Sequence, residues 1–570
     1  MAASARVLAF VGLFSIAVGD EIPRVEIRTG TVIGEAVEFR HEPNRTIHVY
    51  KGIPFAEPPI GELRFREPVP RAEETDQSLS VISVTDPIDE DCLYLNVYAP
   101  QGRAEPAAVM VWFHGGGLIS GSASMAYYDG VPLAAIGDVI IITVNYRLGA
   151  LGFLYTGDDM APGNAGLYDQ RLALMWVQDN IEAFGGDPNR VTLFGFSAGA
   201  SSVGFHLISP LSSGLFHRGI IQSGSPSSSW LTISDQQIAR NRAFALGKIL
   251  NCESESTEEL VSCLRKVPAE KFIVPGTQMY MISPITGEST TTFPFYATVD
   301  GRFIPENVNK MLKDHSFNKL KVMMGFAKDE GTFMPFLFMP QMRNETELFV
   351  DRANFDSIFD ATVSQVKGKP ILKELIEYQY SDKVEFDSHV NYADLLNEIM
   401  TDLSASCAVL DVTHAYASAE QRVYLYHYTH QPSRSIYDIA WMKAAHGELQ
   451  QYLFGFHLME GWDWNITDEE AEMSLRIMKY WTNFAKTGDP NTSEDGENVT
   501  AADGNEYWPP YSKLNLRYKT LNPEMPNGQS LKERECVFWN DLLPGLVDYT
   551  DYAADHEKEK YSEKLNKPMP

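Results

Sequence analysis

Short apolar runs alternate with amphipathic stretches along the chain. Five runs rich in β-branched and aromatic residues predict strands, over residues 108–113, 139–144, 191–194, 321–325 and 423–428. Apolar residues recur at helical spacing over 167–184 and 469–486, which predicts two helices. Strands that alternate with helices are typical of a mainly parallel sheet flanked by helices, so the predicted fold class is α/β.

The ends of the chain differ from its middle. Residues 1–19 have the pattern of a secretory signal: Arg6 gives a positive start, and the apolar run that follows is too short to span a bilayer. Length alone suggests several domains, but no linker rich in Pro, Gly or Ser divides the remainder. We therefore expect a single domain over residues 20–546 and a charged, solvated tail over residues 547–570.

Other features of the sequence agree with export. It carries five Asn-x-Ser/Thr sequons, at Asn44, Asn344, Asn465, Asn491 and Asn498. No later stretch is long and apolar enough to cross a membrane, and the charged end lacks the apolar tail of a GPI signal. The sequence thus predicts a secreted, extracellular glycoprotein. In that compartment five cysteines leave one thiol without a partner.

Acidic residues outnumber basic ones by 76 to 47, which gives a formal net charge of −29. This balance argues against nucleic acid or an anionic membrane as the main partner. It is compatible with two roles, solubility and attraction of a cationic substrate. Hydrophobic residues make up 44 % of the chain, so it can bury a large core and is not disordered by composition.

The sequence Gly-Phe-Ser-Ala-Gly at 195–199 is a candidate nucleophile elbow around Ser197. The predicted strand 191–194 precedes it, and residues 198–208 can form a helix after it. A strand, a tight turn and a helix are the context in which G-x-S-x-G lifts a serine hydroxyl out of a sheet. The turn also places that hydroxyl at the positive end of the helix.

A second glycine-rich turn is a candidate oxyanion hole. His-Gly-Gly-Gly at 114–117 directly follows the predicted strand 108–113. Such a turn can aim backbone N–H groups at one point, where a negatively charged oxygen forms during acyl transfer. We expect Gly116 and Gly117 to supply two donors and Ala198 the third.

Other stretches of the chain carry a more specific pattern. They read YKGIPFAEP at 50–58, EDCLYLNV at 90–97, NYRLGALGFL at 145–154, GNAGLYDQRLALMW at 163–176, GFAKDEGTF at 325–333, HGE at 446–448 and WTNFAKTGDP at 481–490. With the stretch around Ser197, they resemble the type-B carboxylesterase and cholinesterase family of α/β-hydrolases over roughly residues 23–545. The resemblance implies hydrolysis of a small-molecule ester, with no metal and no organic cofactor.

The resemblance also completes a triad. Asp329 and Glu330 both follow the predicted strand 321–325, and the residues alone do not choose between them. The resemblance assigns the acid to Glu330 and the base to His446. The order Ser197, Glu330, His446 is that of α/β-hydrolases. His446 would take the proton of Ser197, Ser197 would attack the ester, and Glu330 would orient His446.

The cysteines follow the same family pattern with one exception. By resemblance Cys252 pairs with Cys263 and Cys407 with Cys536. In the family, Cys92 would bridge to an upstream cysteine across a loop that walls the active-site gorge, and here no upstream cysteine exists. The chain between 64–66 and 90–92 is shorter than the family pattern. The missing piece includes the segment where cholinesterases carry the tryptophan that packs on choline.

Several positions bear on the substrate. Trp230, Phe293 and Phe333 match aromatic pocket positions of the family, and Thr291 replaces an acyl-pocket aromatic of strict acetylcholinesterases. Phe196 stands where cholinesterases have a glutamate. With both the gorge tryptophan and that carboxylate absent, we expect a carboxylesterase with an apolar pocket and broad ester specificity.

Two other functions stay open at this point. One is a true cholinesterase, in which the short segment before Cys92 reflects a splice or gene-model error. The other is an adhesion or binding protein without activity, although such relatives usually lack triad residues and all three are present here. The sequence is compatible with a monomer and with a homodimer.

Overall fold

Strand β7 (Ala107–Phe113) shows how the sequence builds the core. All of its residues are buried, as expected for a strand covered on both faces of a parallel sheet. Successive side chains of a strand point to opposite faces. Accordingly Val109 and Phe113 join one hydrophobic cluster, whereas Met110 and Trp112 join a second one. The continuous apolar run in the sequence thus supplies both layers of the core.

The computed structural model describes residues 22–41, 44–72, 78–79, 88–228, 231–272, 286, 294–363, 370–380, 390–494 and 507–546. Besides β7, the large sheet contains β3 (Glu35–Phe39), β4 (Arg45–Pro54), β6 (Tyr94–Pro100), β8 (Ile140–Val144), β9 (Gly186–Phe196), β10 (Arg218–Gln222), β13 (Lys321–Ala327), β14 (Val423–Tyr428), β15 (Arg517–Leu521) and β16 (Asn527–Gln529). Two small sheets contain β1 (Arg24–Ile27), β2 (Gly30–Ile33) and β5 (Ser78–Leu79), and β11 (Thr232–Ile233) with β12 (Ala297–Thr298).

The large sheet is 11-stranded, in the order β16-β15-β14-β13-β10-β9-β7-β8-β6-β4-β3. Its strands from β15 to β8 pair in parallel. The strands at the two edges pair antiparallel. The parallel centre matters for function because the carboxyl ends of β9, β13 and β14 then meet at one edge of the sheet.

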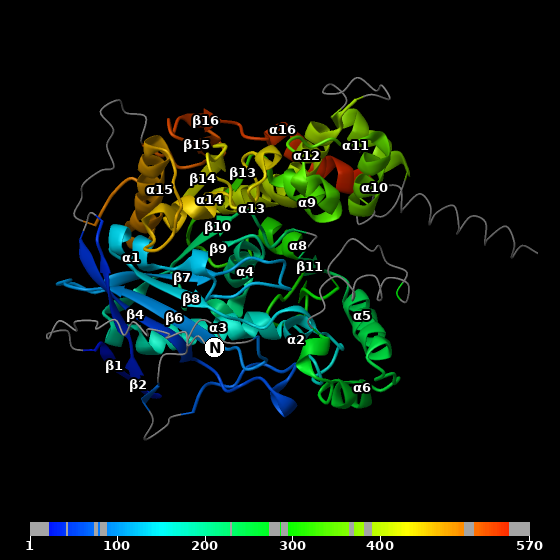
Figure 1. Cartoon of the computed structure of the whole chain (residues 1–570). Helices are drawn as coiled ribbons and strands as arrows, with labels where there is room; N and C mark the ends of the chain where they lie inside the picture. The colour runs from blue at the N-terminus through cyan, green and yellow to red at the C-terminus, as the bar shows by residue number, and fades with distance from the viewer. Residues whose placement is uncertain are drawn as a thin grey trace, which may run out of the picture.

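Helices cover both faces of this sheet (Figure 1). They are α1 (Val131–Gly137), α2 (Gly149–Phe153), α3 (Ala165–Asn180), α4 (Ala198–Ile208), α5 (Gln236–Ile249), α6 (Thr257–Leu264), α8 (Val308–Lys313), α9 (Phe333–Phe338), α10 (Arg352–Val363), α11 (Pro370–Gln379), α12 (Ala393–Thr401), α13 (Cys407–Ser418), α14 (Leu449–Leu453), α15 (Asp468–Thr487) and α16 (Glu533–Val537). Apolar residues of α3 and α4 join one core cluster, and those of α1 and α15 join the other.

The predicted α/β fold class is confirmed, and each predicted strand lies in an observed one, except that β8 begins one residue after the predicted start at Val139. The stretch 167–184 differs in detail, because α3 ends at Asn180 and a 3₁₀ turn, Ile181–Phe184, completes it. Among the described helices, none combines the length and the apolar character that a bilayer crossing needs. The signal expected at 1–19 and the tail expected at 547–570 lie outside the described residues.

The predicted disulfides Cys252–Cys263 and Cys407–Cys536 are both formed. Cys92 carries a free thiol, and burial raises its pKa to about 12. The thiol is therefore protonated at neutral pH and a poor nucleophile.

An ion pair that was not predicted from the sequence closes the short segment before Cys92. Arg64 Nε and Nη2 donate to both oxygens of Glu90, at 2.5 and 2.6 Å. This buried pair joins the two ends of the segment.

The sequons differ in their surroundings. Asn44, Asn344 and Asn465 are exposed, and Asn498 lies outside the described residues. Asn491 is only 3 % exposed, and its Nδ2 donates to Asp489 Oδ1 and to the backbone oxygen of Trp508. A glycan on Asn491 is incompatible with this packing. The expectation for this sequon is therefore corrected: the pattern of three residues contained no information about burial.

Helix α15 packs on the face of the sheet whose side chains form the second hydrophobic cluster. Its first turn is closed by a capping box between Thr467 and Glu470. Met473, Ile477 and Phe484 are fully buried, as the helical spacing of the apolar residues predicts. Trp481 Nε1 donates to Gln222 Oε1 at 2.7 Å, at the end of strand β10.

We expect Ile477→Ala to lower the free energy of unfolding by about 2–5 kcal/mol, because it leaves a cavity in this interface. The exposed Glu472 on the same helix supplies a control, and Glu472→Ala should change stability by less than about 0.5 kcal/mol. Urea unfolding followed by circular dichroism measures both. Equal midpoints for the two variants would contradict the packing described.

Candidate active site

Ser197 sits in a strained turn between β9 and α4. Its φ of 57° and ψ of −123° place it in a backbone region that residues other than glycine rarely adopt. The Ser197 N–H donates to the backbone oxygen of Gln222 at 2.9 Å, which holds the turn against β10. The predicted strand, turn and helix are all present, so the structure has the form of a nucleophile elbow.

The two glycines that flank Ser197 are required by close contacts. A Cβ at Gly195 would clash with the backbone of Gly199, and a Cβ at Gly199 would clash with the backbone oxygen of Phe113. The helix α4 therefore passes directly over the end of β7. This explains both glycines of the motif without any reference to catalysis.

Ser197, His446 and Glu330 form a continuous chain of hydrogen bonds. His446 Nε2 lies 2.9 Å from Ser197 Oγ, and His446 Nδ1 lies 2.5 Å from Glu330 Oε2. Glu330, whose side chain is 1 % exposed, also accepts the N–H of Ala327 at 2.6 Å. The carboxylate thus fixes the ring of His446 with Nε2 directed at the serine hydroxyl, which is the arrangement of a general base beside a nucleophile.

The neighbouring Asp329 has a different set of contacts. Its Oδ1 accepts Asn397 Nδ2 at 2.9 Å and its Oδ2 accepts the N–H of Ala444 at 3.2 Å. Its own N–H donates to the backbone oxygen of Ala444 at 3.0 Å. Asp329 therefore joins the loop of Glu330 to the loop of His446, and it makes no hydrogen bond to the imidazole.

The candidate oxyanion hole lies next to the nucleophile. A Cβ added to Gly115 would be 3.1 Å from the Cβ of Ser197. Gly116 and Gly117 both have positive φ, at 114° and 64°, which explains the glycines there. Within the described residues, the N–H groups of Gly116, Gly117 and Ala198 donate no hydrogen bond. These donors are therefore available to a substrate oxygen.

The side chain of His114 helps to hold this turn in place. Burial lowers its pKa to about 4, so the imidazole is neutral near pH 7. Its Nδ1 lies 2.8 Å from the oxygen of Gly115, and its ring stacks on Tyr146 with centroids 4.5 Å apart. The Tyr146 hydroxyl donates to the backbone oxygen of His114 at 2.7 Å. The turn is thus held by side chains that the motif alone did not identify.

Aromatic rings surround the imidazole of His446. The ring of Phe196 lies 4.5 Å from it and that of Phe333 lies 5.2 Å from it, both measured between centroids. The Tyr437 hydroxyl donates to the backbone oxygen of His446 at 2.5 Å. Phe333 therefore lies beside the triad, as its pocket assignment requires, whereas Trp230 and Phe293 lie outside the described residues. Tyr437 was not predicted, because no motif surrounds it.

The fold and this site define a hydrolase with a serine nucleophile on an α/β sheet. The profile of the carboxylesterase family matches residues 21–539, so the chain belongs to that family. It is 35 % identical to an acetylcholinesterase of Bungarus fasciatus, over 94 % of this chain and 89 % of the relative. It is 33 % identical to an acetylcholinesterase of Electrophorus electricus and 34 % to one of Danio rerio, with at least 90 % of either chain covered. Family membership supports a carboxylic ester hydrolase.

The geometry gives a test of the two neighbouring acids. We expect Glu330→Gln to lower kcat for a nitrophenyl ester by about a thousandfold or more, since the amide no longer stabilises charged His446. Asp329→Asn keeps the shape of a side chain that bonds Asn397 and the N–H of Ala444 but not the imidazole, so kcat should fall less than about tenfold. Steady-state kinetics of both variants measures the difference. A larger loss in Asp329→Asn than in Glu330→Gln would reverse the assignment.

Proposed function

We propose that the protein is a secreted serine esterase that hydrolyses uncharged carboxylic esters through an acyl-enzyme. The observation that carries the proposal is the hydrogen-bond chain from Glu330 through His446 to Ser197. It supplies a nucleophile, a base and a group that orients the base, which together are sufficient for acyl transfer.

Each step can be assigned to a group in the site. His446 Nε2 accepts the Ser197 proton while Oγ attacks the ester carbonyl carbon. The carbonyl oxygen, now negative, is held by the N–H groups of Gly116, Gly117 and Ala198, each worth about 3–4 kcal/mol in related sites. The alcohol leaves with the proton from His446. Water then gives a proton to His446, attacks the acyl group and releases the acid, and Ser197 recovers its proton.

The surroundings of the triad favour an uncharged ester. Phe196, directly before the nucleophile, places an aromatic ring where a cholinesterase has a carboxylate, and Phe333 adds a second ring. Apolar walls favour acyl and alcohol groups without charge, because a cation would lose hydration there without gaining an ion pair.

Hydrolysis of choline esters is the second candidate. The relatives named above are acetylcholinesterases, and the net charge of −29 would attract a cation toward the molecule. Aromatic faces can also bind a quaternary ammonium without a carboxylate. A role as a binding protein without activity receives less support, because all three triad side chains are in hydrogen-bond contact.

Secretion is supported by three independent features. Residues 1–19 carry the pattern of a signal, two disulfides are formed, and the sequons Asn44, Asn344 and Asn465 are exposed. We propose these three asparagines as the glycan sites within the described residues.

We expect purified protein to hydrolyse nitrophenyl butyrate faster than acetylthiocholine and to be labelled by a fluorophosphonate. Ser197→Ala should lose labelling and about 10⁴-fold or more in kcat. A spectrophotometric ester panel and gel fluorescence measure this. Much faster hydrolysis of acetylthiocholine would favour a cholinesterase. Folded wild-type protein that is neither active nor labelled would favour the binding role.

The ring of Phe196 offers a direct test of charge selectivity. Phe196→Glu should raise kcat/KM for acetylthiocholine by about five- to twentyfold relative to its uncharged analogue 3,3-dimethylbutyl thioacetate, because it adds an anion beside the alcohol group. Phe196→Gln has a similar shape without the charge and should leave this ratio near the wild-type value. Taking the ratio removes any effect of the new side chain on His446. Equal ratios in all three proteins would refute the electrostatic explanation.

A further inference from the structure

Glu448 is a fully buried carboxylate two residues after His446. Burial raises its pKa to about 7, so the side chain is mainly ionised above that pH. Within the described parts of the chain, no cation forms an ion pair with it. A buried carboxylate without a cation is costly unless hydrogen bonds replace its water. The groups that donate those hydrogen bonds therefore show what the side chain holds.

Three donors reach the Glu448 carboxylate from two segments of the chain. The Ser435 hydroxyl donates to Oε1, and the N–H of Ile436 donates to Oε2 at 3.3 Å. From helix α14, Gln451 Nε2 donates to Oε2 at 2.6 Å. Glu448 thus ties the segment 435–437 to the short helix that follows the base.

The segment 435–437 in turn holds the base. Ser435 Oγ accepts the N–H of Tyr437 at 3.0 Å, and the Tyr437 hydroxyl donates to the backbone oxygen of His446 at 2.5 Å. Burial raises the pKa of Tyr437 well above its usual value, so this hydroxyl keeps the proton that it donates. A continuous path of hydrogen bonds therefore runs from Glu448 to the backbone of His446.

The ring and the backbone of His446 are held by different groups. Glu330 fixes the ring through Nδ1, and Tyr437 fixes the backbone from which the ring projects. A misplacement of about 1 Å can cost about a hundredfold in rate. Because His446 lies in a long connection, the position of Nε2 before Ser197 depends on both supports.

We propose that Glu448 is a positioning residue for the general base and acts on His446 through Ser435 and Tyr437. Its carboxylate sets the place of the segment 435–437, and Tyr437 passes that place on to the backbone of His446. The role lies in the hydrogen bonds that the carboxylate accepts. The proposal rests on the esterase function proposed above.

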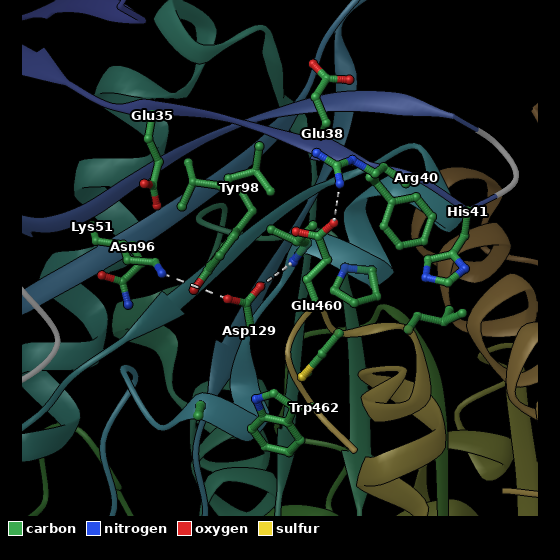
Figure 2. A pocket seen from close by; sticks show the side chains of 18 of the residues that line it. Glu35, Glu38, Arg40, His41, Lys51, Asn96, Tyr98, Asp129, Glu460 and Trp462 are labelled. Atoms are coloured by element: carbon green, nitrogen blue, oxygen red, sulfur yellow. Dashed lines mark hydrogen bonds and ion pairs between the residues drawn. The ribbon is translucent and has the colours of Figure 1, made fainter. Parts of the chain in front are cut away.

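Two substitutions of Glu448 separate its hydrogen bonds from its charge. Glu448→Met keeps the length but accepts no hydrogen bond, so kcat for nitrophenyl butyrate at about pH 8 should fall about tenfold with KM within about twofold. Glu448→Gln should keep kcat within about threefold, because its oxygen can accept the two N–H donors and its nitrogen can donate to Ser435. The control is Glu35→Met, at an exposed residue of edge strand β3 in the pocket of Figure 2, which should have wild-type kcat.

A double-mutant cycle tests the path through Tyr437. Tyr437→Phe should itself lower kcat about tenfold, and Glu448→Met should then add less than about threefold in that background. A loss of about a hundredfold in the double variant, the product of the single effects, overturns the proposal. So does wild-type kcat in Glu448→Met, or an equal loss in Glu448→Gln and Glu448→Met, which would show an effect of charge. If thermal unfolding shows that Glu448→Met does not fold, Ser435→Ala breaks the same path at a partly exposed residue.

A proton NMR spectrum separates this proposal from the proposed function. The proton between His446 Nδ1 and Glu330 should resonate far downfield, since that hydrogen bond is short, and Glu330→Gln should remove the signal. Tyr437→Phe and Glu448→Met should shift or broaden it whether or not the protein hydrolyses esters, and Glu35→Met should leave it unchanged. An inactive wild type with these shifts would refute the esterase and support the positioning role. Unchanged spectra in both variants would refute the positioning role.

Discussion

The close contact between the nucleophile turn and the end of strand β7 is the constraint on which the site depends. Helix α4 can pass over β7 only because Gly199 has no side chain to strike the backbone of Phe113. The same contact brings the Gly115 turn to within van der Waals distance of Ser197. Nucleophile and oxyanion donors therefore form one packed unit, and their relative position is fixed by backbone contacts instead of mobile side chains. Such preorganisation is what electrostatic stabilisation of an oxyanion requires.

The acid Glu330 and the base His446 follow strands β13 and β14, which lie on the side of β9 opposite to β7. Glu330 follows β13 directly, while His446 lies in a long connection between β14 and α14. Long connections are usually variable in position, so something must hold the imidazole. Asp329 does so through both its backbone and its carboxylate contacts to Ala444, and Tyr437 binds the backbone of His446 itself. Burial raises the pKa of Asp329, and its hydrogen bonds from Ala444 and Asn397 act in the opposite direction.

Most of the fold and the core of the site were predictable because they follow local rules. Apolar runs and helical spacing identified β7, β9 and α15, and a strand, a glycine turn and a helix identified Ser197. The choice between Asp329 and Glu330 was not local, because both follow the same strand: the family resemblance assigned Glu330, and the fold shows that this carboxylate faces His446. Tyr437 and the Arg64–Glu90 pair had no sequence signal, because Tyr437 lies outside the quoted motifs and Arg64 is distant from Glu90 in the chain. Asn491 shows the opposite error. Its sequon is a local pattern, but its side chain donates a hydrogen bond to the backbone oxygen of Trp508 and is not free to carry a glycan.

The apolar wall beside the triad and the acidic surface of the molecule act over different distances. The rings of Phe196 and Phe333 form the described wall beside His446. A net charge of −29 draws cations to the whole surface, but long-range attraction falls off within about 8 Å at physiological salt and does not decide which group binds beside the triad. Selection must come from short-range contacts. A cation that reaches the triad meets aromatic rings and finds no carboxylate at position 196, so an acidic surface is consistent with the proposed preference for uncharged esters.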